Sequence, residues 1–272
     1  MRFLYGKDVL LTGGSSGIGL AAAELFASNG YTVFAASRNP GGDTKTFPGG
    51  GQIRPIALDV RDSLSVETAV ETVLSMADIG IVIHCAGIGI ACAAEEFPCE
   101  SVAGLMETNF NGVLRLNSRI LPHMRKRGKG LCLIIGSLAG LFPIPFQSHY
   151  SASKAALDLY AGAMRMELRE YNVKVCLVMP GDTNTGFTDA RKYEIDETSP
   201  YYEACVKAVK KMENDELGGA SPSTVAKILL RLSARKNPPS RITVGFNYKL
   251  LVFLHKLLPN KLIEFILVRM YL

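Results

Sequence analysis

The chain has 272 residues, of which 48% are hydrophobic and 20% are charged, and its formal net charge is +5. This apolar content is enough for a sizeable core, and single α/β domains often reach this length. The basic excess is mild and scattered, and its densest run, at 125–130, has no base-stacking aromatic residues beside it, so no nucleic-acid partner is expected.

The cysteines and the N-terminus predict reduced thiols in a cytoplasmic protein. None of the six cysteines sits in a C-x-x-C pair, and several lie in apolar runs. The N-terminal stretch passes almost at once into a strand-like run and shows no cleavage-site pattern of a secretory leader. The spacing of Cys85, Cys92 and Cys99 matches no usual zinc pattern, so no metal site is expected.

Apolar runs alternate with segments of helical periodicity along most of the chain. The runs that predict strands lie at 8–14, 31–37, 53–60, 79–87, 130–137, 173–181 and 241–246. The segments that predict helices lie at 19–30, 63–77, 99–127 and 151–172. Because the strands are continuously apolar, they are typical of a parallel sheet that is covered on both faces.

These elements predict a single α/β domain over residues 1–272. We expect a Rossmann-type doubly wound parallel sheet of about seven strands with helices on both faces. A looser, polar segment at 186–222 is expected to form a lid over the substrate, with its charges facing solvent. An unusually apolar tail follows at 247–272.

A glycine-rich turn, TGGSSGIG at 12–19, lies between the first predicted strand and helix. Glycine lets a backbone approach a pyrophosphate, and a helix N-terminus offers free N–H groups and the positive end of a dipole. The turn therefore predicts a dinucleotide site. It also fits the G-x-S-x-G turn of a hydrolase with Ser15 as nucleophile, but neither His149 nor His255 is an obvious partner for that serine.

The end of the second predicted strand indicates which dinucleotide binds. A carboxylate at this position would accept from the ribose 2′-OH of NAD and repel the 2′-phosphate of NADP. The chain instead has Ser37 followed by Arg38, and a guanidinium can grip a phosphate with two charge-assisted hydrogen bonds. The sequence therefore predicts NADP(H) rather than NAD(H).

Tyr150 and Lys154 lie four residues apart, so both face the same side of a helix. An ammonium group near a phenol favours the phenolate and lowers the phenol pKa from its usual value of about 10. Ser137 ends the fifth predicted strand, at the edge of the sheet where such folds bind ligands. The three side chains together predict a general acid–base site for a carbonyl or hydroxyl group.

The chain resembles the classical short-chain dehydrogenase/reductase family from about residue 7 to about residue 190. The matching motifs are, in chain order, TGGSSGIG at 12–19, Asp59 in LDV, CAG at 85–87, Asn109 in ETNFNG, Ser137 in GSLAG, YSASK at 150–154 and PGDTNTG at 180–186. Two motifs depart from the family pattern: IGS replaces ISS, which spares Ser137, and His84 and Cys85 replace two asparagines. That exchange changes the local hydrogen bonding and leaves the catalytic set intact.

The resemblance implies a catalytic set of four residues. Tyr150 is the general acid in reduction and the base in oxidation, and Lys154 lowers its pKa and binds the nicotinamide ribose. Ser137 positions the substrate oxygen, and Asn109 supports a water-linked proton relay through the lysine. The expected cofactor contacts are Thr12, Gly13, Ser15, Ser16, Gly17, Ile18, Gly19, Ser37, Arg38, Asp59, Val60, Ala86, Gly87, Tyr150, Lys154, Pro180, Gly181, Thr183 and Thr185.

The expected substrate is bulky and hydrophobic, because few charges accompany the apolar side chains near the catalytic residues. The expected substrate contacts are Leu138, Leu141, Phe142, Ile144, Phe146 and Phe187. The C-terminal arrangement is similar to that of hydroxysteroid- and retinol-type members of the family, which favours a secondary alcohol or ketone such as a hydroxysteroid or bile acid. The alternatives are a 3-ketoacyl-thioester reductase, with 125–130 as its carrier-docking patch, and a non-catalytic NADPH-binding regulator.

The apolar tail at 247–272 leaves several interpretations open. Pro259 divides it, and neither half reaches the roughly 20 residues that span a bilayer. It caps the substrate pocket, packs between subunits, or makes a peripheral membrane contact. In the last case Lys249, Lys256, Lys261 and Arg269 would face headgroups. The family resemblance implies a homodimer or homotetramer.

Overall fold

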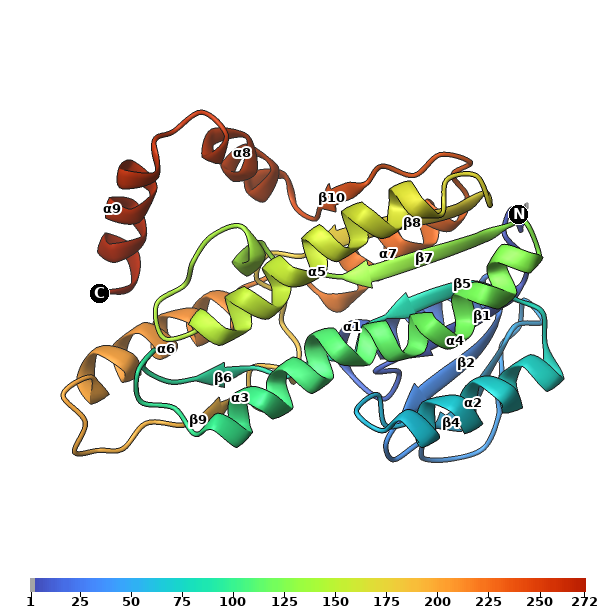
Figure 1. Cartoon of the computed structure of the whole chain (residues 1–272), viewed down its shortest axis with the longest axis horizontal. Coiled ribbons are helices and arrows are strands. Elements are labelled where there is room, and N and C mark those ends of the chain that lie inside the picture. The colour runs from blue at the N-terminus through green and yellow to red at the C-terminus, as the bar shows by residue number, and fades with distance from the viewer. Residues whose placement is uncertain (1–2) are drawn as a thin grey trace.

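A mostly parallel sheet forms the centre of the molecule. The computed structural model describes residues 3–272, and the main sheet of this part has eight strands in the order β10-β8-β7-β5-β1-β2-β4-β3 (Figure 1). They are β1 (Asp8–Thr12), β2 (Thr32–Ser37), β3 (Lys45–Thr46), β4 (Gln52–Ala57), β5 (Ile79–His84), β7 (Gly130–Ile135), β8 (Val173–Met179) and β10 (Arg241–Thr243). The predicted doubly wound α/β fold is confirmed. The extra strand is β3, an exposed two-residue strand that runs antiparallel to β4 and has no apolar signal.

Helices cover both faces of this sheet. The α-helices of the described residues are α1 (Gly17–Ser28), α2 (Ser63–Met76), α3 (Cys99–Met106), α4 (Gly112–Lys126), α5 (Ser148–Glu167), α6 (Tyr202–Leu217), α7 (Pro222–Ser233), α8 (Phe246–His255) and α9 (Asn260–Tyr271), of which α1 and α7 cover one face and α2, α4 and α5 the other. Neighbouring residues of β1 show the two-sided burial. Leu10 packs in one cluster with Leu116 of α4, and Leu11 packs in the other with Phe26 of α1 and Leu229 of α7. Burial on both faces explains why the strands are continuously apolar.

The order of the strands places a crevice beside β1. This strand pairs with β2 on one side and with β5 on the other, and Thr12 at its end lies opposite Ala36 and His84. The chain therefore winds away from β1 in both directions, and the carboxyl ends of β1 and β5 flank the switch point where open α/β sheets bind ligands.

The long helical region predicted at 99–127 is interrupted in its middle. A five-residue π-helix, η1 (Glu107–Asn111), joins α3 to α4. Such π-turns are rare and occur often at functional sites. The backbone at both ends of the π-helix stays in the right-handed helical region, so this interruption needs no helix-breaking residue. The sequence therefore carries no signal of it.

The segment at 186–222 is more regular than the looser lid that the sequence predicted. Its second half forms α6, which buries Cys205, Ala208, Val209 and Met212. These four residues have the i, i+3, i+4, i+7 spacing of an amphipathic helix, a signal that the polar composition of the segment obscures. In its first half, β9 (Lys192–Tyr193) pairs in parallel with β6 (Ile90–Ala91), which fixes the segment to the loop after β5.

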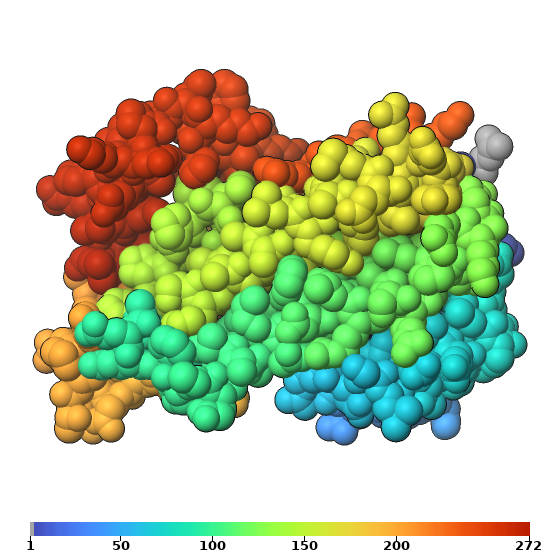
Figure 2. Space-filling view, viewed as in Figure 1, coloured from blue at the N-terminus to red at the C-terminus, as the bar shows by residue number. Residues whose placement is uncertain are grey.

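The C-terminal tail forms α8 and α9, a helical pair at one end of the molecule (Figure 1), and its atoms form the red lobe in Figure 2. Tyr248 attaches α8 to the body, since its hydroxyl donates to Asp182 Oδ2 at 2.5 Å. No helix among residues 3–272 is both long and apolar enough to cross a membrane. The large exposed apolar side chains of the tail are Phe246, Leu250, Leu251, Phe253, Leu254, Leu257, Leu262, Phe265, Ile266, Val268, Met270 and Leu272.

Candidate active site

The glycine turn lies at the carboxyl end of β1 and opens α1. Gly13 has a φ of 72° and Gly17 a φ of 52°, a region that side chains disfavour. A Cβ on Gly19 would lie 2.0 Å from the Gly13 carbonyl oxygen, so the turn requires glycine there. Ser15 and Ser16 are exposed, and no side chain caps α1 at Ser16, which leaves the first N–H groups of the helix available to a phosphate.

The loop after β8 reaches this turn from the far end of the sequence. A Cβ on Gly17 would lie 3.4 Å from Thr185 Cβ, and both residues line one cavity of about 430 Å³. Earlier in the loop, the Thr183 hydroxyl donates to the Gly181 carbonyl, and the Pro180 carbonyl accepts from the Leu138 N–H. The fold therefore brings this loop together with the glycine turn and with the turn after β7.

The exposed end of the crevice carries two arginines and one aspartate. Asp59 accepts hydrogen bonds from Arg61, at 2.7 Å from Nη2 and at 3.0 Å from Nε. These bonds, together with the nearby charge of Arg38 after β2, hold the pKa of Asp59 below its usual range. Sequence analysis missed Arg61, although it follows the LDV motif directly. Val60, between Asp59 and Arg61 in the chain, is buried against Gly112 of α4.

Three polar groups meet where the chain leaves β5. The Asn109 side chain accepts from the Ile88 N–H at 2.8 Å and donates to the Ile88 carbonyl at 2.9 Å. A Cβ on Gly87 would lie 3.4 Å from Asn109 Oδ1 and 3.8 Å from Lys154 Nζ. The neighbouring Ala86 N–H points to Thr12 Oγ1 at 3.4 Å. The π-helix thus holds Asn109 against the same turn that faces the lysine.

The exchange of two asparagines for His84 and Cys85 has a structural compensation. His84 is buried, and its Nε2 lies 3.0 Å from Asn117 Oδ1 in α4. Burial lowers the pKa of His84 to about 4, so the imidazole is neutral near pH 7 and donates to the amide oxygen. Burial also raises the pKa of the Cys85 thiol to about 12. The His84 imidazole and the Cys85 thiol are therefore both neutral near pH 7, so the exchange adds no charge to the site.

Tyr150 and Lys154 share one face of α5, and the lysine nitrogen lies 5.7 Å from the centroid of the tyrosine ring. Lys154 Nζ donates to the Ile135 carbonyl at 3.0 Å, at the end of β7. Ser137 lies two residues after this strand and accepts from the Ala139 N–H, which fixes its turn. The structure thus brings Ser137, Tyr150, Lys154 and Asn109 to one end of the sheet.

The pKa of Tyr150 differs from the sequence expectation. Burial raises it to about 12, and the neighbouring Ser137 hydroxyl only partly opposes that rise. Burial also lowers the pKa of Lys154 to about 8. The expected lowering of the phenol pKa by the lysine is therefore wrong, because desolvation dominates and the lysine charge is not among the effects that oppose it. The phenol is fully protonated at neutral pH and can donate a proton.

An apolar cluster that sequence analysis missed packs against Tyr150. Its members come from the loop after β5, from β6 and from α3: Ile88, Ile90, Cys92, Phe97, Leu105 and Met106. The continuation of the apolar run beyond CAG, in the stretch IGIAC at 88–92, was the available signal. The Phe187 ring covers the tyrosine from the lid segment, with ring centroids 5.7 Å apart.

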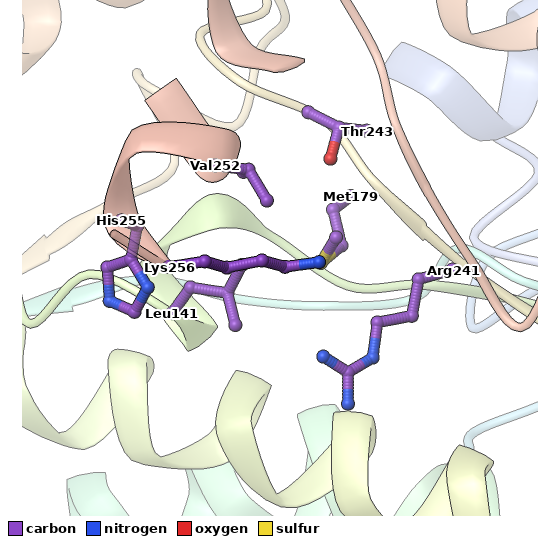
Figure 3. Close-up of a pocket in the computed structure, with 7 residues that line it drawn as sticks. All are labelled: Leu141, Met179, Arg241, Thr243, Val252, His255 and Lys256. Atoms are coloured by element: carbon purple, nitrogen blue, oxygen red, sulfur yellow. The ribbon is translucent and has the colours of Figure 1, made fainter. Parts of the chain in front are cut away.

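The other expected substrate contacts are spread over a wider area. Phe146 packs beside the buried Val209 of α6, and Leu141 lines a cavity of about 360 Å³ beneath α8 (Figure 3). Leu138 and Phe142 are buried in the main core. Ile144 is half-buried in the loop before α5.

The two histidines weighed as hydrolase partners make contacts of their own. His149 Nδ1 lies 3.5 Å from Cys92 Sγ, and its ring packs on Phe97. The His255 ring packs edge-on against Phe142, with ring centroids 4.7 Å apart. Because both imidazoles lie in these side-chain clusters, the hydrolase alternative for Ser15 lacks a base.

Two charges of the lid segment are buried rather than solvated. The Arg191 side chain is 0% exposed and pairs with Glu216, which is itself 18% exposed. The Thr188 hydroxyl donates to the other oxygen of this carboxylate at 2.6 Å. The expectation that the charges of the segment face solvent is therefore wrong for this pair, because α6 folds back and supplies a partner that the local sequence does not reveal.

Comparisons with known proteins agree with this geometry. The family model for short chain dehydrogenases matches residues 7–196. A 3-ketodihydrosphingosine reductase of Bacteroides thetaiotaomicron is 38% identical over 240 residues, which cover 87% of each chain. The ketoacyl reductase HetN of Nostoc sp. is 32% identical over 269 residues, which cover 92% of this chain and 94% of the relative.

The fold comparison gives the same result. A short-chain dehydrogenase from Streptomyces avermitilis superposes with a TM-score of 0.80 at 25% identity, and the match covers 92% of each chain. The family model alone spans well over half of the sequence. The resemblance found in the motifs is therefore confirmed, and the chain belongs to the short-chain dehydrogenase/reductase family of oxidoreductases, which use a nicotinamide nucleotide.

Proposed function

We propose that this protein uses NADPH to reduce a ketone on a long-chain lipid to a secondary alcohol. The observation that carries the proposal is the convergence of Asn109, Ser137, Tyr150 and Lys154 at one end of the sheet, beside an apolar cluster. The likeness to a 3-ketodihydrosphingosine reductase, 38% identical over most of both chains, supports a lipid ketone as the substrate.

The catalytic roles follow from the protonation states. NADPH bound along the glycine turn and Thr185 supplies the hydride for the carbonyl carbon. Ser137 donates a hydrogen bond to the carbonyl oxygen, and the Tyr150 hydroxyl, whose pKa of about 12 keeps it protonated, gives that oxygen its proton. The Lys154 ammonium stabilises the phenolate that remains. Asn109 fixes the turn at Gly87 and Ile88. It also supports a water-linked relay through Lys154 that returns a proton to Tyr150.

Preference for NADPH is supported by the charges at the exposed end of the crevice. Arg38 follows β2 directly, and its charge reaches Asp59, where Arg61 is also bound. Ser37 ends the strand with a hydroxyl rather than a carboxylate. A 2′-phosphate placed there would meet two guanidinium groups and no unpaired acid.

The lipid ketone is preferred over the other substrates considered. The basic run at 125–130 begins at the end of α4, and Arg127 donates to the Tyr5 carbonyl before β1 and to Asp78 before β5. The run thus lies at the amino ends of the strands, opposite the catalytic residues, where a docked acyl carrier could not deliver its thioester. A hydroxysteroid or bile acid remains the second candidate, since the apolar cluster beside Tyr150 suits it as well.

The tail supports a peripheral membrane contact. Leu250, Phe253 and Leu254 of α8 and Leu257 in the turn after it form an exposed apolar stripe, with Lys249 and Lys261 also exposed nearby. Lys256 is exposed as well, but its side chain lies along the cavity beneath α8 and points its ammonium toward Met179 (Figure 3). We place the protein in the cytoplasm, consistent with its six free thiols, and as a homo-oligomer by analogy with its family.

The substrate proposal is tested with a panel of ketones and the purified full-length protein. The panel holds 3-ketodihydrosphingosine, a ketosteroid, a keto bile acid and a 3-ketoacyl thioester, and NADPH consumption is followed by absorbance. We expect the highest kcat/KM with the sphingoid ketone. Turnover confined to the steroid-type ketones would replace the lipid proposal with the second candidate. Binding of NADPH without turnover of any member would favour the non-catalytic regulator.

A further inference from the structure

Arg191 lies in the part of the lid segment that packs over the catalytic residues. The Lys192 N–H, next in the chain, donates to the Gly89 carbonyl at 3.1 Å. A Cβ on Gly89 would lie 3.8 Å from Arg191 Cγ and 2.9 Å from the Phe187 ring. That ring packs on Tyr150. The aliphatic part of Arg191 and the Phe187 ring therefore both pack against Gly89. This glycine directly follows Ile88, whose backbone Asn109 binds.

The guanidinium of Arg191 is only partly satisfied by the protein. Its Nη2 pairs with Glu216, whereas Nε and Nη1 are buried and have no hydrogen-bond partner among residues 3–272. Buried donors without partners are costly, and the cost is larger for charged groups. A ligand that supplies the missing acceptor would remove this cost. The charge of Arg191 also acts on Tyr150, which places the guanidinium near the reacting phenol.

The two unpaired donors limit what this ligand can be. A carboxylate or phosphate grips a guanidinium through two parallel N–H groups of one edge. Both such edges of Arg191 include Nη2, and Glu216 takes one of the two Nη2 N–H groups, so at most one edge remains open. Glu216 also neutralises the charge of the arginine. Because this pair carries no net charge, the site favours an uncharged oxygen acceptor over an anion.

We infer that Arg191 binds an uncharged oxygen of the substrate, a hydroxyl or a carbonyl, a few bonds from the ketone that is reduced. This inference rests on the proposed function, since it assigns the part of the lipid that the enzyme recognises besides its chain. Arg191 then acts as a specificity residue: it fixes which carbonyl of a flexible lipid lies beside Tyr150. The Glu216 carboxylate and the Thr188 hydroxyl hold the guanidinium in place.

The test uses two ketones that differ in one hydroxyl. In 3-ketodihydrosphingosine the terminal hydroxyl lies two carbons from the ketone, and the 1-deoxy analogue lacks it. We expect the wild-type protein to prefer the hydroxylated ketone by about ten- to hundredfold in kcat/KM, the range of a hydrogen bond to a charged group. Arg191→Met should remove that preference, because kcat/KM for the hydroxylated ketone falls toward the value for the deoxy analogue.

Three further proteins separate recognition from a structural role. Arg191→Lys keeps a donor and should restore part of the preference. Glu216→Gln releases the guanidinium and should weaken the preference without abolishing turnover of the deoxy analogue. Arg119→Met removes an arginine of a surface pair with Glu67 and is the matched control, expected to behave as the wild type.

The outcomes distinguish the inference from the proposal beneath it. A wild-type protein that reduces both ketones equally would overturn the role of Arg191 and leave the proposed reduction of lipid ketones standing. Equal losses on both ketones in Arg191→Met would do the same, since they would indicate a structural role only. Failure of the wild type to reduce either ketone would contradict the proposed function and the inference together.

Discussion

At the scale of single residues, the site depends on how burial changes proton affinities. The sequence identifies Tyr150 and Lys154 as a pair, but it does not show which of two opposing effects is larger. In the structure the phenol pKa rises to about 12 and the ammonium pKa falls to about 8, and burial is the main cause of both shifts. Lys154 is therefore the group that titrates within the working range of an enzyme, and Tyr150 is not.

This difference predicts the pH dependence of reduction. The pKa of Lys154 is lowered, so the ammonium is present below about pH 8 and is lost as the pH rises through that value. Without it the Tyr150 phenolate is no longer stabilised. We expect kcat/KM for reduction to be level below about pH 8 and to fall above it, as measured by NADPH consumption under saturating cofactor.

Lys154→Arg provides the control for this profile. The guanidinium stays charged at every pH tested, so the fall above about pH 8 should disappear even if the absolute rate is lower. The same fall in the arginine variant would assign the titration to another group.

Arg38 predicts the preference between the two dinucleotides. Arg38→Asp places a carboxylate beside the expected 2′-phosphate and removes one of the two guanidinium groups at that end of the crevice. We expect kcat/KM for NADPH to fall by at least about tenfold while that for NADH changes little or rises. An unchanged ratio would mean that the 2′-phosphate is bound elsewhere, and Arg61→Asp would then be the next variant to measure.

At the scale of elements, helices outside the predicted pattern complete the site. The π-helix η1 places Asn109 against Ile88, and α6 supplies Glu216 to the lid. The helices α8 and α9 leave most of their apolar side chains exposed, although α8 is fastened through Tyr248 to the loop after β8. An exposed apolar surface of this extent indicates a partner surface, and the nearby cations favour an anionic membrane.

The stripe on α8 predicts binding to lipid vesicles. The triple substitution Leu250→Ser, Phe253→Ser and Leu257→Ser removes the most exposed part of the stripe, where the side chains are 54%, 58% and 65% exposed. We expect the full-length protein to sediment with vesicles that contain phosphatidylglycerol, less so at high salt, and the triple variant to lose at least about tenfold in partitioning.

A matched control exists on other helices of the same chain. Leu64, Leu159 and Met166 are 69%, 75% and 73% exposed, so their replacement by serine changes the composition equally and should leave vesicle binding unchanged. If the wild type ignores the vesicles and the triple variant instead dissociates an oligomer, the stripe is a subunit interface and the membrane contact is refuted.

At the scale of the whole molecule, the sequence predicts the sheet far better than the lid. The strands are apolar on both faces and the glycine turn has a single compatible geometry, so local patterns determine the doubly wound fold. The burial of Arg191 depends on Glu216, which lies 25 residues away in the chain. That pairing follows from how α6 folds back over the site, and no local pattern records it. The Tyr150 pKa likewise depends on residues from several elements.

The proposed role of Tyr150 is that of the proton donor in reduction of a lipid ketone by NADPH. Its most direct test is the rate of NADPH consumption with 3-ketodihydrosphingosine for the wild type and for Tyr150→Phe, beside a fluorescence measurement of NADPH binding by both. Because the substitution removes only the phenolic hydroxyl, we expect NADPH binding within about twofold of the wild type and a loss of turnover of at least about a hundredfold. Turnover above a tenth of the wild-type rate with NADPH still bound would rule out Tyr150 as the proton donor.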